Sequence, residues 1–386
     1  MFSKNLNHKS LLLVGNHRSD TGYAWWLMES FWAKLAEHWH DSTRVLLAYP
    51  EITRLPSVIA RAPLQTIQQD FTKVGCYDIL KQCLFIKRHK ICAIYFSDRA
   101  TCSWIYFFYK LFGVKLIVVH EHSPGNRIPV IGLKAFVKQV IHRLPWLSVD
   151  GAIGATDYVR QRLIEVNQIS TQRCYSAPNG LPPVRFQLKP VDLHKCYDIP
   201  VDRKIMIMTG RAHRYKGVQF VLYCMEKLNE IARASLHFIF VGDGPDLNLF
   251  ISTAQDLGLS GQCSFLGKRD DVAALLDGAD FAIHASLGEV GYSLSILEYM
   301  RAGLPVIVPD NPSVCGATVH EVTGLVYPEN DQQSASSMIE QLLFDDLLRQ
   351  KMGAAAQLAA QHFTLEATHD ALIKAMKSID KRGVLT

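Results

Sequence analysis

Short runs of β-branched and aliphatic residues alternate with longer amphipathic runs along the whole chain, and this alternation limits the fold more than any other feature of the sequence. Strands that are linked by helices form parallel sheets with both faces covered. The pattern occurs twice, on either side of a proline-rich, non-periodic stretch at residues 179–200. We therefore predict an α/β protein with two doubly wound, Rossmann-like domains that are joined near residue 185.

The positions of the expected strands indicate where functional residues should lie. In the first half they are residues 10–15, 44–49, 91–96, 114–120 and 149–155. In the second half they are residues 204–210, 236–242, 263–267, 279–285 and 304–310. Ligands bind beyond the carboxyl ends of the strands of open parallel sheets, so we expect function in the loops that follow the strands and in an interdomain cleft that both domains face.

Cysteine usage and the apolar runs predict a cytoplasmic location. The nine cysteines are scattered and include no C-x-x-C pair, which indicates reduced thiols rather than disulfides or a zinc site. The first apolar run is only five residues long, too short for a secretory signal. The apolar stretch at 104–119 is interrupted by Lys110, Gly113 and Lys115, so it does not resemble a spanning helix.

Charge is unevenly distributed between the halves. Residues 1–182 carry 22 Lys and Arg against 12 Asp and Glu, a net +10, whereas the remainder carries 19 against 24, a net −5. This asymmetry favours an anionic partner for the first half, such as the inner face of the cytoplasmic membrane, unless it is incidental surface charge. Aromatic residues crowd 23–39 and 103–115, where they form either core or an exposed face that docks on an anionic bilayer. No nucleic-acid partner is expected.

Two cations follow the first expected strand of the second half. Gly210 ends that strand, Arg211 and Lys216 come next, and a helix is expected to begin near Gly217. A guanidinium, an ammonium and the free amides of a helix N-terminus together suit a diphosphate. The alternative is a pair of ordinary loop cations.

A second candidate element is the glycine-rich start of a helix at residues 288–310. The amides from Gly291 onward could face the same phosphates, while Glu298 lies beside the packed face marked by Leu294, Leu297 and Met300. An unpaired carboxylate in such a place is unfavourable. A pair of sugar hydroxyls on a ligand would satisfy it, and so would a neighbouring arginine or backbone amides.

Four motifs in the second half resemble those of family 4 retaining glycosyltransferases, enzymes of the GT-B fold, in their order and approximate spacing. They are GRAHRYKG at 210–217, VGDGP at 241–245, the stretch at 288–310, and HEVTGLVYPEND at 320–331. The first half is similar mainly in VKLIVVHEHSPG and SAPNG. The resemblance implies an acceptor-binding domain at 1–185, a nucleotide-sugar-binding domain at 186–362, and a helix at 363–386 that packs back on the first domain.

The resemblance also implies roles for single residues. Arg211 and Lys216 would bind the donor diphosphate, and Glu298 would bind the ribose. His120 would lie near the reacting sugar, with His122 as the competing candidate. The remaining donor-binding candidates are glycines and the start of the second helix: Gly22, Gly210, Gly291, Tyr292, Ser293 and Leu294.

The sequence departs from the family pattern at one position. The family has two glutamates with seven residues between them, but position 290, where the first is expected, is Val290. Either Glu289 takes over the grip on the transferred sugar, or the backbone amides of Val290 to Ser293 do so. We favour Glu289, and count it with His120, Arg211 and Lys216 as catalytic.

The chain contains no pair of aspartates two residues apart, so we expect no metal and no other cofactor. The leading hypothesis is a retaining, metal-independent glycosyltransferase. It would move a sugar from a nucleotide-sugar to a glycan or lipid-linked acceptor, in bacterial cell-surface polysaccharide synthesis. The alternatives are a nucleotide-sugar epimerase and an inactive nucleotide-sugar-binding protein.

Overall fold

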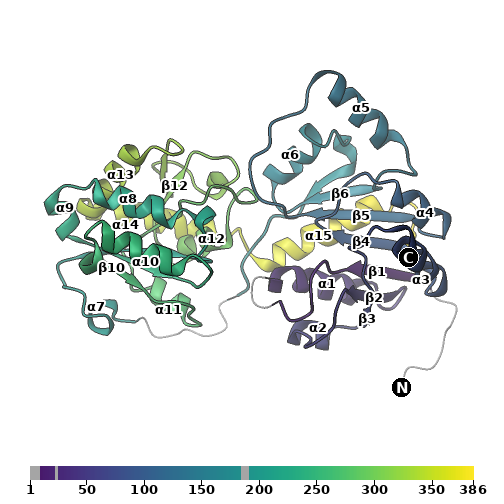
Figure 1. Cartoon of the computed structure of the whole chain (residues 1–386), viewed down its shortest axis with the longest axis horizontal. Helices are drawn as coiled ribbons and strands as arrows, with labels where there is room; N and C mark the ends of the chain where they lie inside the picture. Colours follow the sequence, from purple (N-terminus) through teal and green to yellow (C-terminus); the bar gives the residue numbers. More distant parts are fainter. Residues whose placement is uncertain (1–8, 22–24, 184–190) are drawn as a thin grey trace. The chain divides into compact units, whose positions relative to one another are not determined.

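The computed structural model describes residues 9–21, 25–183 and 191–386, and they form two compact units, each a parallel sheet with helices on both faces (Figure 1). Unit 1 comprises residues 1–123, 127–178 and 368–386, and unit 2 comprises 124–126 and 179–367. The prediction of two Rossmann-like α/β domains is confirmed. Within the described residues, no helix is both long and apolar enough to cross a bilayer, and all nine cysteines are free thiols.

The seven-stranded sheet of unit 1 has the order β3-β2-β1-β4-β5-β6-β7. Its strands are β1 (Ser10–Val14), β2 (Arg44–Tyr49), β3 (Gln65–Gln68), β4 (Ile91–Ser97), β5 (Leu116–Glu121), β6 (Gly151–Gly154) and β7 (Cys174–Ser176). Its helices are α1 (Trp26–Trp39), α2 (Ser57–Arg61), α3 (Cys76–Arg88), α4 (Ile105–Leu111), α5 (Gly132–Arg143), α6 (Asp157–Glu165), the 3-10 turn η2 (Thr171–Arg173) and α15 (Leu365–Ile379).

Residues 368–386 complete unit 1 from the far end of the sequence. Ile379 of α15 packs against Gly151 of β6, where a Cβ atom would come within 2.6 Å of its side chain. The carbonyl oxygen of Leu385 accepts a hydrogen bond from the Thr43 hydroxyl at 2.7 Å, ahead of β2. Buried residues of α15, such as Leu372 and Met376, belong to the core on this side of the sheet.

The six-stranded sheet of unit 2 has the order β10-β9-β8-β11-β12-β13. Its strands are β8 (Lys204–Thr209), β9 (Leu236–Val241), β10 (Cys263–Phe265), β11 (Phe281–Ile283), β12 (Val306–Pro309) and β13 (Gly324–Tyr327). Its helices are α7 (Leu193–Cys196), α8 (Val218–Glu226), α9 (Glu230–Ala234), α10 (Leu247–Asp256), α11 (Val272–Leu276), α12 (Leu294–Arg301), α13 (Gln332–Phe344) and α14 (Asp346–Ala360), with 3-10 turns η3 (Arg214–Lys216), η4 (Ser260–Gln262) and η5 (Cys315–Ala317).

Side chains of β8 alternate between two apolar cores. Met206 and Met208 join the core beneath α8, α10 and α13, whereas Ile205 and Ile207 join the core beneath α11, α12 and α14. Because side chains of a strand point to alternate faces, the four central residues of β8 are all apolar, and the strand is buried on both sides. This central strand carries the cations of the candidate site at its carboxyl end.

The unit boundaries differ from the expected positions 185 and 362. Leu181 pairs with Phe363 and Leu365 through backbone hydrogen bonds of 2.9 and 2.8 Å. The carbonyl oxygen of Asn179 accepts a bond from the Tyr292 hydroxyl at 3.0 Å. These contacts hold residues 179–183 and 363–367 in unit 2, so the chain passes between units at 178/179 and at 367/368.

Candidate functional site

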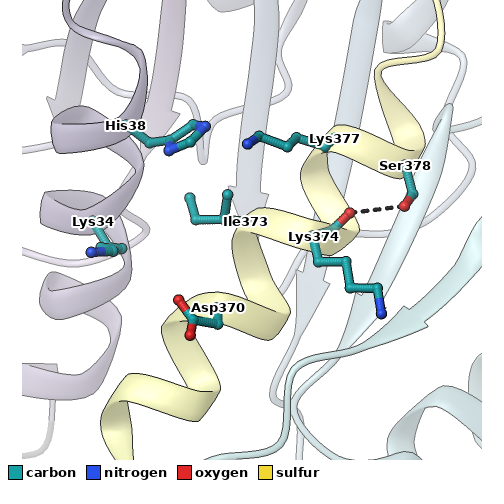
Figure 2. Close-up of a pocket in the computed structure, with 7 residues that line it drawn as sticks. All are labelled: Lys34, His38, Asp370, Ile373, Lys374, Lys377 and Ser378. Atoms are coloured by element: carbon teal, nitrogen blue, oxygen red, sulfur yellow. Dashed lines mark hydrogen bonds between the residues drawn. The ribbon is translucent and has the colours of Figure 1, made fainter.

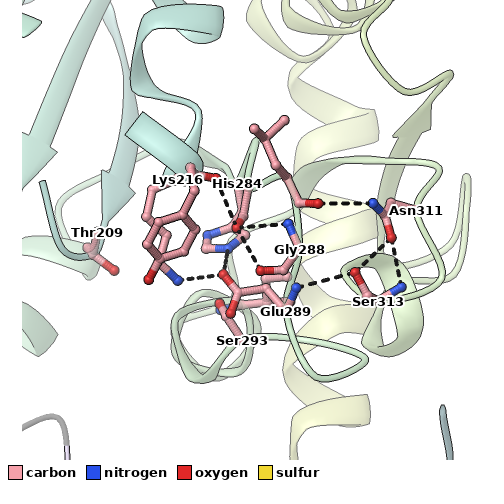
Figure 3. Close-up of polar contacts among 12 residues, drawn as sticks. Thr209, Lys216, His284, Gly288, Glu289, Ser293, Asn311 and Ser313 are labelled. Carbon is pink, nitrogen blue, oxygen red and sulfur yellow. Dashed lines mark hydrogen bonds and ion pairs between the residues drawn. The ribbon is translucent and has the colours of Figure 1, made fainter. Parts of the chain in front are cut away.

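The candidate site of unit 2 lies where the strand order reverses. β8 and β11 are neighbours in the sheet but are separated in the chain by two strands, and their connections leave in opposite directions. Such a switch point leaves room for a ligand beyond the strand ends. Thr209 ends β8, and His284 follows β11 directly. Both are labelled in Figure 3.

A buried ion pair occupies this switch point. Lys216 Nζ donates to Glu289 Oε1 at 2.5 Å, and His284 Nε2 donates to the same oxygen at 3.1 Å (Figure 3). Burial opposes the charged carboxylate, but Lys216 and His284 lower the pKa of Glu289 to about 2. Burial also opposes the Lys216 ammonium, and the Glu289 carboxylate outweighs it, so the pKa of Lys216 is raised. Both groups are therefore charged at neutral pH.

The two carboxylate oxygens of Glu289 differ in their contacts. Oε1 accepts both bonds, whereas Oε2 accepts none from the residues that the structure describes. Burial lowers the pKa of His284, so the ring is neutral and its Nε2 carries the proton that Glu289 accepts. Glu289 is thus fixed through one oxygen, and its other oxygen is available to a hydroxyl group of a ligand.

Buried polar side chains fix the loop that carries Glu289. The amide of Glu289 donates to Ser313 Oγ at 3.3 Å, and Ser313 Oγ donates to Asn311 Oδ1 at 2.7 Å. The amide of Gly291 donates to the Ser313 carbonyl oxygen at 2.7 Å. Gly291 has a φ of +112°, a conformation that strongly favours glycine. The chain needs this glycine to turn from Glu289 into α12.

Helix α12 begins at this loop, and one of the donor-binding candidates, Ser293, caps its N-terminus. Ser293 Oγ accepts the Ile296 amide at 3.3 Å, which is the bond of a helix N-cap. Leu294 is half-buried against the core of unit 2. The Tyr292 side chain is buried in that same core, with its ring against Phe363, so only its backbone remains a candidate for contact with a donor.

Glu298 lies one turn further along α12 and is half-buried. Within the described part of the chain its carboxylate has no hydrogen-bond or ion-pair partner, and burial raises its pKa despite the nearby Arg301. Its neighbour Tyr299 bonds the Thr209 amide at 2.6 Å, which packs this turn of α12 against the end of β8. Within the described residues neither an arginine nor a backbone amide pairs with Glu298, and its contact with a ligand stays a prediction.

Arg211 follows β8 and is exposed, with no partner for its guanidinium among the described residues. The chain then returns through η3 to Gly217, which has a φ of +81° and lies against the end of β11. A Cβ atom at Gly217 would lie 2.0 Å from the carbonyl oxygen of Ala285, so glycine is required there. This close approach brings Lys216 to Glu289, while Gly210 and Arg211 stay at the strand end.

In unit 1, His120 is fully buried near the end of β5. Its Nδ1 bonds the Tyr95 hydroxyl at 2.5 Å, and its Nε2 has no partner. The His122 ring lies close by, tilted against that of His120 at 4.0 Å between ring centroids, and both of its nitrogens are buried and without partners. Burial lowers the pKa of both rings, that of His122 to about 4, so both are neutral. Gly22 lies outside the described residues.

A basic hollow in unit 1 was not among the sequence candidates. A pocket of about 590 Å³ between α1 and α15 is lined by Lys34, His38, Asp370, Ile373, Lys374, Lys377 and Ser378 (Figure 2). Partial burial, Lys377 and Lys34 all lower the pKa of His38. The hollow shares no residue with the candidates near Glu289 or His120. It adds to the positive charge of unit 1.

Sequence reasoning missed His284, Asn311 and Ser313. His284 lay inside the expected strand at 279–285, near its carboxyl end, and a polar residue at that position was a usable signal, since β11 lies next to β8 at the switch point. Asn311 and Ser313 bond backbone and each other, so no residue pattern distinguishes them from ordinary loop residues. No group of three or more His, Cys, Asp or Glu within 9–21, 25–183 and 191–386 is arranged to hold a metal ion.

Comparison with known proteins finds similarity to one family in the second half of the chain. Residues 192–359 match the family described as glycosyl transferases group 1. The N-acetyl-alpha-D-glucosaminyl L-malate synthase of Bacillus anthracis is 29% identical over 174 residues, 45% of each chain. The chain spans about half the length of the curated relatives that it matches.

Solved structures match nearly the whole chain. A glycosyltransferase from Rickettsia africae has a TM-score of 0.76 at 17% identity, over 98% of this chain and 100% of that one. Anabaena Alr3699/HepE, solved with UDP-glucose, has a TM-score of 0.71 at 16% identity, over 96% and 100%. Identities this low establish the fold. The chain therefore has the GT-B fold of two Rossmann-like units, and its residues 192–359 are similar to the glycosyl transferases group 1 family.

Proposed function

We propose that the protein is a retaining, metal-independent glycosyltransferase of family 4, and that unit 2 binds its nucleotide-sugar donor. The observation that carries the proposal is the arrangement at the switch point. A fixed carboxylate, Glu289, has one oxygen free, and two further groups, Arg211 and Glu298, have no partner in the described structure. Charged groups in such positions are those that a ligand would satisfy.

Each group suits one part of a nucleotide-sugar. Arg211 and the amides at the start of α12 are suited to the diphosphate, and Lys216 adds a positive charge beside it. Glu298 can accept two hydroxyl groups, as the ribose offers. The free Oε2 of Glu289 can accept a hydroxyl of the transferred sugar, which favours Glu289 over the amides of Val290 to Ser293.

The proposed chemistry uses charges that the chain itself supplies. As the bond from the sugar to the diphosphate breaks, Arg211, Lys216 and the α12 amides stabilise the negative charge on the departing oxygen. The acceptor oxygen attacks the same face of the sugar, and its proton passes to the departing diphosphate. His120 stays a proposed partner of the sugar because its neutral ring has one nitrogen, Nε2, without a partner, but side chains that bury this atom would have to move to admit the sugar.

The donor in the proposal is a nucleoside diphosphate sugar, and UDP-sugars are the first to test because HepE was solved with UDP-glucose. The acceptor in the proposal is a glycan or a lipid-linked glycan of the bacterial surface. Unit 1 would bind it while the protein contacts the inner face of the cytoplasmic membrane peripherally.

The test combines a binding panel with a transfer assay. Nucleoside diphosphates that bind only the folded protein should raise its melting temperature with concentration. The sugar donors of the best base are then incubated with and without membrane extract as acceptor. Sugar incorporation that needs the extract supports the proposal. Conversion of the donor without acceptor would identify an epimerase. Binding without any turnover would identify an inactive binding protein. The absence of any binding would refute donor recognition.

A further inference from the structure

Helix α5 is attached to unit 1 by its polar side. His142 is its buried residue, and the ring bonds the Thr101 hydroxyl at 3.0 Å. Lys138 Nζ donates to the Val166 carbonyl oxygen at 2.7 Å, and Gln139 donates to Gln168 at 2.9 Å. Surface helices ordinarily bury an apolar stripe and expose polar residues. The polarity of α5 is therefore the reverse of what folding alone would favour.

The opposite side of α5 is an exposed apolar stripe. Leu133 is 77% exposed and Phe136 is 60% exposed, and Val137, Val140 and Leu144 are exposed as well. Residues at these intervals of three and four share one face of a helix. Contiguous exposed apolar groups on a folded protein mark a surface that contacts a partner or a membrane.

The stripe continues onto α4. Trp146, just after α5, contacts the ring of Phe107 at 5.8 Å between centroids, and Lys110 Nζ of α4 donates to the Pro145 carbonyl oxygen at 2.6 Å. Trp104, Phe107, Phe108 and Leu111 of α4 are all exposed. We call these four residues, Leu144, Trp146 and the stripe of α5 the α4–α5 surface. In Figure 1, α5 lies at the margin of unit 1, beyond α6.

The charged residues of the segment that contains α5 have one sign. Residues 122–149 contain Arg127, Lys134, Lys138 and Arg143 but no Asp or Glu. At about 100° per residue, Lys134 falls on one side of the apolar stripe and Arg143 on the other. Both are exposed. Basic residues that flank an apolar face are the arrangement of a helix lying in the interface of an anionic bilayer.

We propose that the α4–α5 surface docks unit 1 on an anionic lipid bilayer, with the α5 stripe in the acyl boundary and Lys134 and Arg143 at the headgroups. A second copy of the chain is a poorer occupant, because a two-fold interface centred on this surface would bring cations against cations. The aromatic face of α1, which the sequence offered as an alternative, is not available since Phe31, Trp32 and Trp39 are buried. The proposal specifies the membrane contact of the proposed function, and its test needs no sugar transfer.

Vesicle sedimentation tests the apolar stripe. The wild-type chain should sediment with vesicles of phosphatidylcholine and phosphatidylglycerol, and much less with phosphatidylcholine alone. Leu133→Glu with Phe136→Glu should reduce partitioning more than about tenfold, because binding strength scales with the buried apolar area. The matched control is Leu347→Glu in α14, which alters an 80% exposed leucine of unit 2 and should bind as the wild type does. Equal partitioning of all three proteins would overturn the proposal.

A second arm tests the charges. Lys134→Gln and Arg143→Gln should each weaken binding to anionic vesicles about fivefold, since each cation near such a surface is worth about 1 kcal/mol. Added salt should remove this difference. Brominated lipids should quench the fluorescence of Trp146 and Trp104, and a Trp146→Phe, Trp104→Phe variant should lose that quenching.

The remaining outcomes are decisive too. The wild type could instead fail to bind anionic vesicles and form a dimer that Phe136→Glu dissociates. In that case the α4–α5 surface joins two copies of the chain and the bilayer proposal is wrong. Transfer to a short soluble acceptor should persist in the Leu133→Glu, Phe136→Glu variant. Loss of vesicle binding with transfer intact would thus separate membrane docking from the glycosyltransferase function.

Discussion

Glu289 and Glu298 lie nine residues apart, yet the structure predicts opposite effects of pH on their contributions to stability. The perturbation is the replacement of each carboxyl by an amide of the same shape, in Glu289→Gln and Glu298→Gln. The pKa of Glu289 falls from 4.5 to about 2 in the folded state, whereas burial raises that of Glu298. The two variants therefore serve as controls for each other.

For Glu289 the magnitude follows from linkage. A folded pKa below the unfolded one contributes stability above the unfolded value, and this contribution is lost as the pH falls towards the folded value. A shift from 4.5 to about 2 corresponds to about 3 kcal/mol. Only 12% of the side chain is exposed, so solvent screening reduces this figure little. The wild type should lose this amount between about pH 5 and pH 2, and Glu289→Gln should not.

For Glu298 the sign reverses. A raised folded pKa gives stability that is present below the unfolded pKa and is lost as the pH rises through the folded pKa. Glu298→Gln should therefore be more stable than the wild type near neutral pH and equal to it in acid. The buried histidines are present in all three proteins. Their titration therefore affects the differences in unfolding free energy between the proteins far less than the unfolding free energy of each protein.

Urea unfolding at a series of pH values measures both differences. The chain has two units, so the transition that the substitutions move should be assigned to unit 2 before free energies are compared. If the free-energy difference between the wild type and Glu289→Gln does not change with pH, Lys216 does not hold the carboxylate ionised. A stability of Glu298→Gln below that of the wild type at neutral pH would mean that Glu298 has a structural partner, and the ribose assignment would lose its support.

Three further predictions concern donor binding and transfer. Arg211→Ala should lower transfer by roughly 2 to 4 kcal/mol of transition-state stabilisation. The control Lys227→Ala, which removes an exposed cation after α8, should not lower it. Wild-type rates for Arg211→Ala would exclude the diphosphate role. In calorimetric titrations Glu298→Gln should weaken binding of the free nucleoside diphosphate. Glu289→Gln should leave that binding unchanged but reduce transfer. Equal losses of nucleotide binding in the two variants would mean that Glu289 does not contact the transferred sugar. Transfer should persist in excess EDTA, and complete loss that magnesium or manganese restores would contradict a metal-independent reaction.

The repeated pattern of apolar runs was sufficient to predict two Rossmann-like units, because strands buried on both faces are continuous apolar segments. It did not reveal β3, β7 or β13, which are short strands at the edges of their sheets. β3 has the sequence QTIQ, and only one of its four residues is apolar. Edge strands need only one neighbour, so their sequences are less constrained.

The sequence marked Lys216 as a cation ahead of a helix N-terminus and Glu298 as a carboxylate beside the packed face of a helix, and their roles in binding stay predictions. The contact between Lys216 and Glu289 was not predictable, since it depends on how closely Gly217 approaches the end of β11. Nor was the orientation of α5. An amphipathic sequence predicts that a helix has an apolar face, but only its contacts show that this face points away from the core.

The placement of residues 368–386 in unit 1 has a consequence for the order of folding during synthesis. A ribosome releases residues 1–178 first, but the side of the sheet that α15 covers must wait until all of residues 179–367 have been translated. Unit 2 is almost continuous in sequence, so we expect it to reach its native state before unit 1 does. Proteolysis of a released chain that is truncated after residue 367 should therefore cut the first half and spare the second.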